Sequence, residues 1–240
     1  FIASRYGWHA AYGGIGAMAA VSVLLLAWRL PAGLFGAPVD LKTWTDLGRN
    51  RLVVLLLLIT TLQMSGQFAV FTYMAPLLRQ LTGAGPDAVS LVFVTYGVFG
   101  FIGLVIASRI VDAWGGTNTS LLATALVLAG MGVWAVGAGS LTAMAVGVAV
   151  WGLGFASTNS MQQVRLVGAA PSLATASVSL NTSVLYVGQA IGSAAGGTLY
   201  ARDLLRETGY VSIAFVTLAL ITVIATRRMS PASDPHVTQI

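Results

Sequence analysis

Cysteine is absent from the 240-residue chain, and charged residues make up only 8% of it. Without cysteine, neither a disulfide framework nor a thiolate metal site can form. The shortage of charge is equally informative, because roughly a quarter of the residues in a soluble domain are charged. With 57% hydrophobic residues and a mean hydropathy of +0.85, the composition excludes an ordinary soluble domain and predicts a membrane protein.

Motifs of common enzymes are also missing from the sequence. There is no His-Glu-x-x-His metalloprotease pattern, no Gly-x-Ser-x-Gly nucleophile elbow and no phosphate-binding Gly-Lys-Ser or Gly-Lys-Thr. Serines in the apolar stretches have no nearby histidine or lysine to activate them. The basic residues are spread singly or in pairs and form no patch for nucleic acid. We therefore expect no enzyme activity, no metal, no cofactor and no nucleic-acid partner.

Seven long apolar stretches fill most of the chain. Each is near or above the roughly 17 residues that a helix needs to cross a bilayer, and none contains Asp, Glu, Lys or Arg. Their runs are continuously apolar, whereas the strands of a membrane barrel alternate apolar and polar residues. The sequence predicts an all-α polytopic membrane bundle, embedded in lipid, with seven transmembrane helices at Ala10–Trp28, Leu52–Leu78, Val89–Ala107, Ser120–Val136, Leu141–Thr158, Ala174–Leu199 and Tyr210–Ala225.

The loop charges predict the orientation of the chain in the membrane. Lys and Arg accumulate on the cytoplasmic side. An exterior N-terminus places eight basic residues inside and four outside, and the opposite orientation reverses this bias. We therefore expect a cytoplasmic C-terminus. The inner group is Arg29, Lys42, Arg49, Arg51, Arg109, Arg165, Arg227 and Arg228, and the outer group is Arg5, Arg79, Arg202 and Arg206.

The longest internal loop divides the predicted spans. It runs from Arg29 to Arg51, contains Pro31, Gly33, Gly36 and Pro38, and is the best candidate for a boundary between two bundles. Within it, residues 43–47 fit a short amphipathic turn at the membrane surface, but a solvated linker is favoured. The chain starts with Phe1 and shows no signal peptide, so we expect that it is truncated and that further helices precede it.

Because no acid or base lies in a predicted span, amide and phenol side chains are the only candidates for recognising a ligand inside the membrane. Gln63 and Gln67 are four residues apart and therefore share one helix face, which Phe71 and Met74 continue. An amide that faces lipid loses water without replacement, so these groups must face protein or water. Bonds between helices remain the alternative, but the mixed amide and aromatic surface favours a ligand cavity. Together with Gln63, Gln67 and Phe71, the predicted substrate-binding residues are Asn181, Tyr186 and Gln189.

Glycines follow one face of the sixth predicted span. Gly188, Gly192 and Gly196 are four residues apart and form a flat stripe. Small residues let helix backbones approach closely inside a membrane, so we expect this stripe to pack against another helix. Static packing is favoured for each glycine, and a surface that slides during a conformational cycle is the alternative.

Three local patterns resemble one family of transporters. Gly7, Trp8 and His9 resemble the Gly-Trp-Arg that opens the sixth helix of that family, with histidine replacing arginine. Residues 174–183, followed by the glycine stripe and Gly197, resemble its eleventh helix. Ser108, Asp112 and Gly115 lie where the loop pattern Gly-x-x-x-Asp-Arg-x-Gly-Arg has Gly, Asp and Gly, although Ala113 and Gly116 replace both basic residues. On these patterns the chain resembles the C-terminal half of a major facilitator superfamily transporter, of the twelve-helix branch of drug and sugar efflux permeases that exchange substrate for protons.

The resemblance implies an organisation and a mechanism. It makes residues 1–28 the last helix of a truncated N-terminal bundle, 29–51 the central cytoplasmic loop, 52–228 a six-helix C-terminal bundle and 229–240 a cytoplasmic tail. The two bundles would lie in the cell membrane, which is the inner or plasma membrane. They would rock around a site for a small molecule at the middle of that membrane. Because no span here carries a titratable carboxylate, the missing N-terminal bundle would supply the groups that couple transport to protons.

The resemblance also assigns a role to one loop. In the family this loop latches one state of the transport cycle through charge pairs, which implies a conformational role for Asp112 and Gly115, with Arg109 as the candidate for the absent cation. A tight turn with a capping acid is the alternative. For the whole chain, two other functions remain open: a seven-span membrane receptor or sensor, and a membrane assembly subunit that does not transport.

Overall fold

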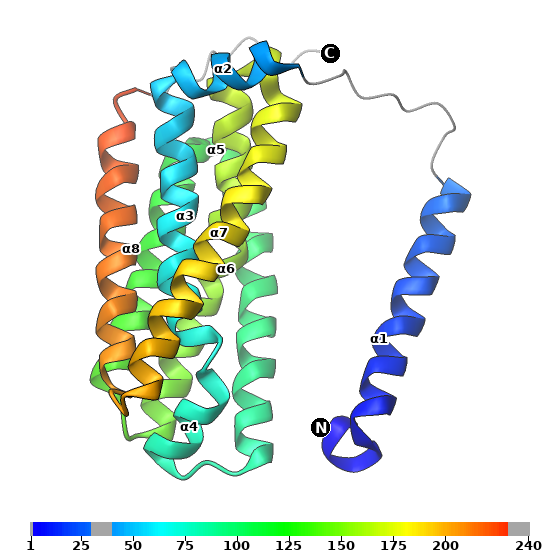
Figure 1. Ribbon diagram of the computed structural model, residues 1–240, viewed down its shortest axis with the longest axis vertical. Helices are drawn as coiled ribbons and strands as arrows, with labels where there is room; N and C mark the ends of the chain where they lie inside the picture. The colour runs from blue at the N-terminus through cyan, green and yellow to red at the C-terminus, as the bar shows by residue number, and fades with distance from the viewer. Residues whose placement is uncertain (1, 30–39, 230–240) are drawn as a thin grey trace.

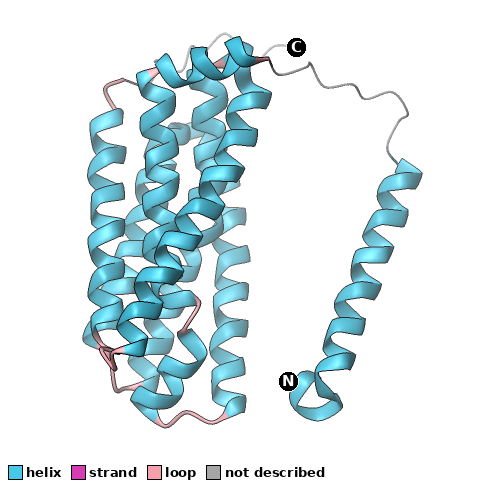
Figure 2. Ribbon diagram, viewed as in Figure 1, coloured by secondary structure: helices cyan, strands magenta, loops and turns pink. Residues whose placement is uncertain are grey.

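The computed structural model describes residues 2–29 and 40–229, and within them the chain is helical (Figures 1 and 2). This confirms the all-α prediction. Residues 30–39 of the predicted central loop and 230–240 of the predicted tail lie outside the described residues. The elements are α1 (Ile2–Arg29), α2 (Leu41–Arg49), α3 (Arg51–Phe71), α4 (Met74–Thr82), α5 (Pro86–Val136), α6 (Leu141–Ala169), a 3-10 turn (Pro171–Leu173), α7 (Ala174–Ala201) and α8 (Glu207–Thr226).

Five of the described helices are long and apolar enough to cross a membrane. They are α1, α3, α5, α6 and α8; α7, which carries Asn181 and Gln189 in its middle, is not among them. One of the five, α5, contains two of the predicted spans in 51 residues, far more than the roughly 20 that cross a bilayer. Gly115 adopts φ 76° and ψ 156° and divides α5 into two limbs, 86–114 and 116–136. Glycine has no Cβ, so this backbone conformation costs it little.

The predicted helix Leu52–Leu78 is interrupted, which corrects the sequence prediction. The first part ends at Phe71, and α4 begins at Met74. The cause is Pro76, which has no N–H to donate to the carbonyl of Thr72 and whose ring would clash with that carbonyl in a continuous helix. The long apolar run therefore consists of one helix that is long enough to cross a membrane and a short second helix after it.

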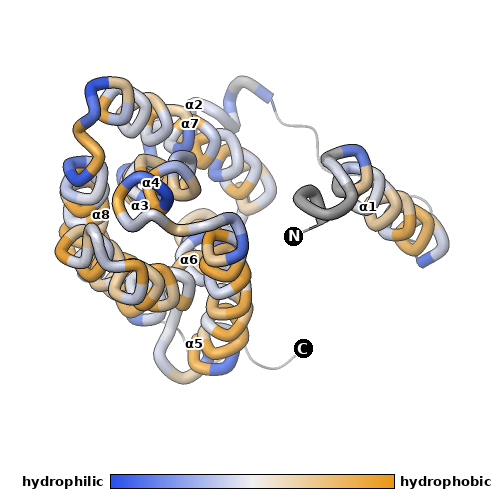
Figure 3. The backbone as a smooth tube through the Cα atoms, turned by 90° about the horizontal axis from the view of Figure 1, so that it is seen from below, coloured by the Kyte–Doolittle hydropathy of each residue, from blue (hydrophilic) through white to orange (hydrophobic). Residues whose placement is uncertain are grey.

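Helices α3 to α8 form one bundle, and α3 is its best buried span, with 67% of its apolar window inside the protein. Packing along both α7 and α8 gives α3 this position (Figure 3). The second limb of α5 approaches α6 closely, since a Cβ on Gly130 or Gly147 would collide with the facing backbone. In contrast, α1 lies apart from the bundle, and every α1 side chain that the structure describes is exposed (Figure 1).

Residues Leu41–Arg49 form α2, which crosses the end of the bundle (Figure 1). Asp40 caps this helix by accepting bonds from the Thr43 backbone N and Oγ1, both at 2.8 Å. The backbone bond first, and then the hydroxyl bond, hold the pKa of the Asp40 carboxyl below its ordinary value. Leu47 is 1% exposed against the bundle, so the solvated linker favoured by the sequence is wrong here.

Candidate functional site

Gln63 and Gln67 lie in the middle of α3, and both side chains are fully buried. Gln63 Nε2 donates to Thr124 Oγ1 on the second limb of α5 at 2.7 Å. Gln67 Nε2 donates to the backbone oxygen of Gln63 at 3.1 Å, and its Oε1 accepts from Trp151 Nε1 on α6 at 2.8 Å. The amide oxygen of Gln63 has no protein partner. The two glutamines thus connect three helices and leave one acceptor unused.

An aromatic cluster continues from this amide pair toward the C-terminal end of α3. The ring of Phe71 is partly buried, and its centroid lies 5.4 Å from that of Phe68, 5.9 Å from Phe93, 5.2 Å from Tyr96 and 6.1 Å from Trp151. Three of these contacts reach across to α5 and α6. Because the Phe68, Phe71 and Phe93 rings are only partly buried, aromatic surface remains open beside the glutamines.

Asn181 occupies a separate junction toward the N-terminal end of α7. Its Oδ1 accepts from Thr60 Oγ1 on α3 at 2.7 Å, and its Nδ2 donates to Asn159 Oδ1 on α6 at 3.2 Å. The side chain is fully buried, while Asn159 is only partly buried. The Asn181 amide therefore ties α7 to both neighbours.

Tyr186 and Gln189 lie on the outward side of α7. The Tyr186 side chain is 64% exposed and Gln189 is partly buried. Exposed Thr182 and Ser183 precede them on the same helix, so this outward surface of α7 carries several polar groups. The structure brings Gln63, Gln67 and Phe71 together, and it places Tyr186 and Gln189 outside that cluster.

Gly188, Gly192 and Gly196 face α3 along one seam. A Cβ added to any of them would come within 3.0 Å of the α3 backbone, at Thr61, Ser65 and Ala69 respectively. The Ser65 hydroxyl donates to the backbone oxygen of Gly188 at 3.1 Å, which fixes the register of the two helices. The seam admits no larger side chain.

The loop residues Asp112 and Arg109 are both exposed near the end of the first α5 limb. Neither side chain has a hydrogen-bond or ionic partner among the described residues. Gly115 makes the sharp turn between the limbs. This arrangement contains a tight turn with free charges beside it and no formed charge pair.

The sequence analysis missed a buried arginine on α6. It ended this helix at Thr158, but α6 continues to Ala169 and places Arg165 inside the bundle at 7% exposure. The Arg165 guanidinium donates to Gln162 Oε1 at 3.1 Å and to Thr226 Oγ1 on α8 at 2.7 Å, while its Nε has no partner. The spacing of Gln162 and Arg165, three residues apart on one helix face, was the available signal.

Metal binding finds no support in the described ranges, where no three His, Asp or Glu side chains gather as a metal site requires. The polar groups of the bundle are amides, hydroxyls, indoles and one buried guanidinium. These groups can hydrogen-bond and stack on an organic ligand, but they cannot activate a nucleophile.

Comparison with known proteins places the chain among transporters. The sequence profile of the Major Facilitator Superfamily matches residues 1–193. The purine ribonucleoside efflux pump NepI of Escherichia coli (strain K12) is 28% identical over 237 residues, covering 95% of this chain and 57% of that protein. The inner membrane transport protein YdhP of Escherichia coli O157:H7 is 28% identical over 233 residues, covering 96% and 59%. An uncharacterized MFS-type transporter of Bacillus subtilis (strain 168), YbcL, is 24% identical over 220 residues, covering 92% and 56%. The chain thus spans somewhat over half the length of these relatives.

Proposed function

The chain belongs to the Major Facilitator Superfamily, a family of transporters rather than enzymes, and we propose that it forms the C-terminal part of a secondary efflux transporter. Relatives named as an efflux pump and as an inner membrane transport protein support this assignment. The remaining length of those relatives leaves room for a preceding bundle. Residues 1–28 then belong to that bundle, 29–51 to the central cytoplasmic loop, 52–228 to a C-terminal bundle and 229–240 to a cytoplasmic tail.

Seven membrane crossings follow if each limb of α5 crosses once and α7 crosses as well. At 28 residues α7 is long enough, and its polar residues suit a helix that faces water or substrate inside a transporter. The exposed apolar surface of α1, including Ile15, Met18 and Leu25, suits contact with lipid or with helices of the preceding bundle. A cytoplasmic C-terminus in a cell membrane completes this topology.

The substrate-binding proposal depends on one observation, which is the buried amide pair of α3 beside partly buried aromatic rings. The Gln63 oxygen is buried and has no partner among the described residues, so it would accept a bond from a ligand only when the helices move apart during the cycle, and the partly buried ring of Phe71 offers a stacking surface next to Gln67. A small amphipathic molecule with both a planar apolar part and hydrogen-bonding groups fits these features. Drug-like and sugar-like compounds meet this description, and the name of one relative adds purine ribonucleosides.

Transport would proceed by alternating access, with this bundle moving against the preceding one. The outward polar surface of α7, with Tyr186 and Gln189, would face the other bundle. Asn181 of the same helix would contact substrate from its junction with α3 and α6, and the glycine seam would let α7 shift along α3. Asp112, Arg109 and Gly115 would form the loop that changes its contacts during the cycle. Protons would be the coupling ion, carried by carboxylates of the preceding bundle, since the carboxylates on the described spans of this chain, Asp87, Asp112 and Glu207, lie near the ends of helices or helix limbs.

The test is transport by the full-length protein in sealed vesicles. The probes are ethidium, an aromatic cation, and adenosine, a purine ribonucleoside. Replacing Gln67→Leu removes the bond to Trp151 and the amide beside Phe71, so we expect about tenfold slower flux, the effect of one or more lost hydrogen bonds. Gln80→Leu is the same change at an exposed position of α4 and also removes one hydrogen bond, from Gln80 Nε2 to the Tyr200 hydroxyl, so it controls for the loss of a bond away from the site and should leave flux unchanged. Normal flux of both probes with Gln63→Leu and Gln67→Leu combined would remove these residues from the site, and no flux of either probe in the unmodified protein would refute the substrate class.

A further inference from the structure

A groove lies at the inner end of the bundle, between the bend of α5 and the end of α8. Its volume is about 640 Å³. One cation, Arg227, and one large exposed ring, Trp114, line it together with Asn118. The remaining lining residues are apolar and lie on the second limb of α5: Leu121, Leu122 and Ala125, with Ala113 before the bend. The groove therefore has a positively charged end and an apolar wall.

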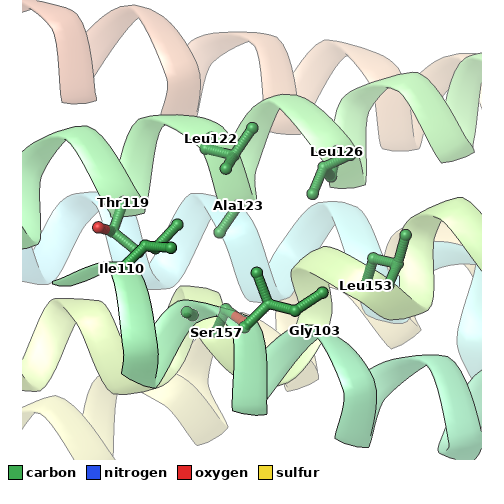
Figure 4. Close-up of a pocket in the computed structure, with 10 residues that line it drawn as sticks. Gly103, Ile110, Thr119, Leu122, Ala123, Leu126, Leu153 and Ser157 are labelled. Atoms are coloured by element: carbon green, nitrogen blue, oxygen red, sulfur yellow. The ribbon is translucent and has the colours of Figure 1, made fainter. Parts of the chain in front are cut away.

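An apolar cavity of about 80 Å³ lies on the other side of Leu122, between the two limbs of α5 and α6 (Figure 4). Leu122 and Leu126 from one limb, Ile110 from the other and Leu153 from α6 contribute to its wall. Leu122 lines both spaces and is 37% exposed, so it forms a low ridge between them. A forked apolar ligand could lie on both sides of this ridge.

The positive charge of Arg227 at the groove has no ionic partner among the described residues. Arg227 forms no ion pair within the described part of the chain, and its exposed neighbour Arg228 adds a second cation. The nearest acid along α5, Asp112, makes no pair with either arginine. Tryptophan and arginine together are typical of the level where lipid headgroups meet the hydrocarbon. Anionic headgroups of the cytoplasmic leaflet are attracted to basic residues at this level.

We propose that this groove binds an anionic phospholipid. Arg227 receives the phosphate, Trp114 lies at the headgroup level, one acyl chain follows Leu121 and Ala125, and the other crosses Leu122 into the cavity. A free phosphate would use only the arginine, whereas the apolar wall and the adjoining cavity match the two chains of a lipid. The proposal requires that the chain resides in a bilayer with this end of the bundle in the cytoplasmic leaflet, which belongs to the proposed topology, but it does not depend on transport.

Native mass spectrometry of the full-length protein tests this proposal, with phosphatidylglycerol and phosphatidylethanolamine of identical acyl chains as probes. We expect the unmodified protein to retain phosphatidylglycerol preferentially. Arg227→Gln should lower the fraction with bound phosphatidylglycerol about fivefold, which is the effect of one basic residue near the membrane surface. Arg228→Gln removes an equal charge one residue away, outside the residues that line the groove, so its effect should be clearly smaller than that of Arg227→Gln if the phosphate lies in the groove.

A second variant tests the apolar part without changing any charge. Leu122→Trp enlarges the ridge and should lower the retention of both lipids, while the elution volume on size exclusion reports that the bundle stays folded. Equal retention of the two lipids by the unmodified protein would overturn the proposal. So would an unchanged Arg227→Gln variant, or an Arg228→Gln variant that loses as much lipid as Arg227→Gln. Unchanged retention by Leu122→Trp would remove the acyl-chain site.

Discussion

Arg165 carries a charge inside the bundle, yet its partners are neutral. The guanidinium bonds to an amide oxygen of Gln162 and to the hydroxyl of Thr226, and no carboxylate lies opposite it among the described residues. A buried charge loses its hydration and is stable only when hydrogen bonds replace that water. Each neutral partner of Arg165 therefore matters more than an ordinary hydrogen bond between helices.

This argument predicts the effect of changing Thr226. Thr226→Val keeps the shape of the side chain but removes the oxygen that accepts from Arg165, so the protein should lose about 1–3 kcal/mol of stability, as expected for a bond to a charged group. Thr226→Ser keeps the hydroxyl and should remain closer to the unmodified protein. Thermal unfolding of both variants in the same detergent measures the difference. Equal melting temperatures for the two variants would show that the hydroxyl does not stabilise the charge.

The residue contacts also show why only part of the candidate site was predictable. Spacing alone places Gln63 and Gln67 on one face of a helix, because residues four apart are neighbours in every α-helix. Their partners are far away in the sequence, with Thr124 61 residues from Gln63 and Trp151 84 residues from Gln67. Such pairs depend on how the helices cross, which a local pattern does not contain. Arg165 was missed for a related reason, because its charge resembles the end of a span when the burial is unknown.

Helix ends were harder to predict than helices. The apolar runs correctly placed helical segments in α1, α3, α6 and α8, since bilayer thickness requires long apolar helices. The interruption at Thr72 and Tyr73 agrees with the local kink that Pro76 and its missing donor indicate in the sequence, although the sequence predicts one span rather than two helices. The sequence predicts the break in α5 between Ala107 and Ser120, and the resemblance singles out Gly115 in that segment. The sequence does not predict that both limbs stay helical up to this glycine.

The seam between α3 and α7 predicts a difference between two otherwise similar substitutions. Gly192→Ala adds one methyl group that would press against the Ser65 backbone, and backbone cannot move aside as a side chain can. Overpacking of this kind typically costs about 1–3 kcal/mol. Gly132→Ala adds the same group on α5, where nothing lies within 4 Å, so it should be neutral or slightly stabilising.

Thermal unfolding of the two glycine variants checks this prediction, and transport gives a second measurement. If the seam slides during the cycle, Gly192→Ala should slow transport at temperatures where the variant is still folded, and Gly132→Ala should not. A Gly192→Ala variant as stable as the unmodified protein would mean that α7 can move away from α3 without cost. That result would show that the close approach of α3 and α7 does not contribute to the stability of the protein.

At the scale of the whole molecule, the polar and apolar surfaces indicate which parts meet lipid. The outer sides of α5 and α8 expose large apolar residues, whereas the outward side of α7 exposes Thr182, Ser183 and Tyr186 beside Val187 and Ile191. The Thr182 and Ser183 hydroxyls donate to backbone oxygens of their own helix, but the exposed phenol of Tyr186 has no hydrogen-bond partner among the described residues and would lose water without replacement in lipid. The uneven surface therefore agrees with a protein in which α7 faces a second bundle or water, and α5 and α8 face the bilayer.

The first limb of α5 offers a direct test of the proposed orientation. Asp87 and Asp112 are exposed near its two ends, and their 25-residue separation corresponds to about 38 Å of helix, which exceeds the hydrocarbon thickness of roughly 30 Å. Because this chain has no cysteine, Asp87→Cys and Asp112→Cys each introduce a single reactive site into it. Any cysteine elsewhere in the full-length protein is first replaced by serine. In sealed right-side-out vesicles, an impermeant maleimide should label Asp87→Cys directly and Asp112→Cys only after the membrane is opened. The reverse pattern would invert the topology deduced from the arginines, and direct labelling of both variants would show that the limb does not cross the bilayer.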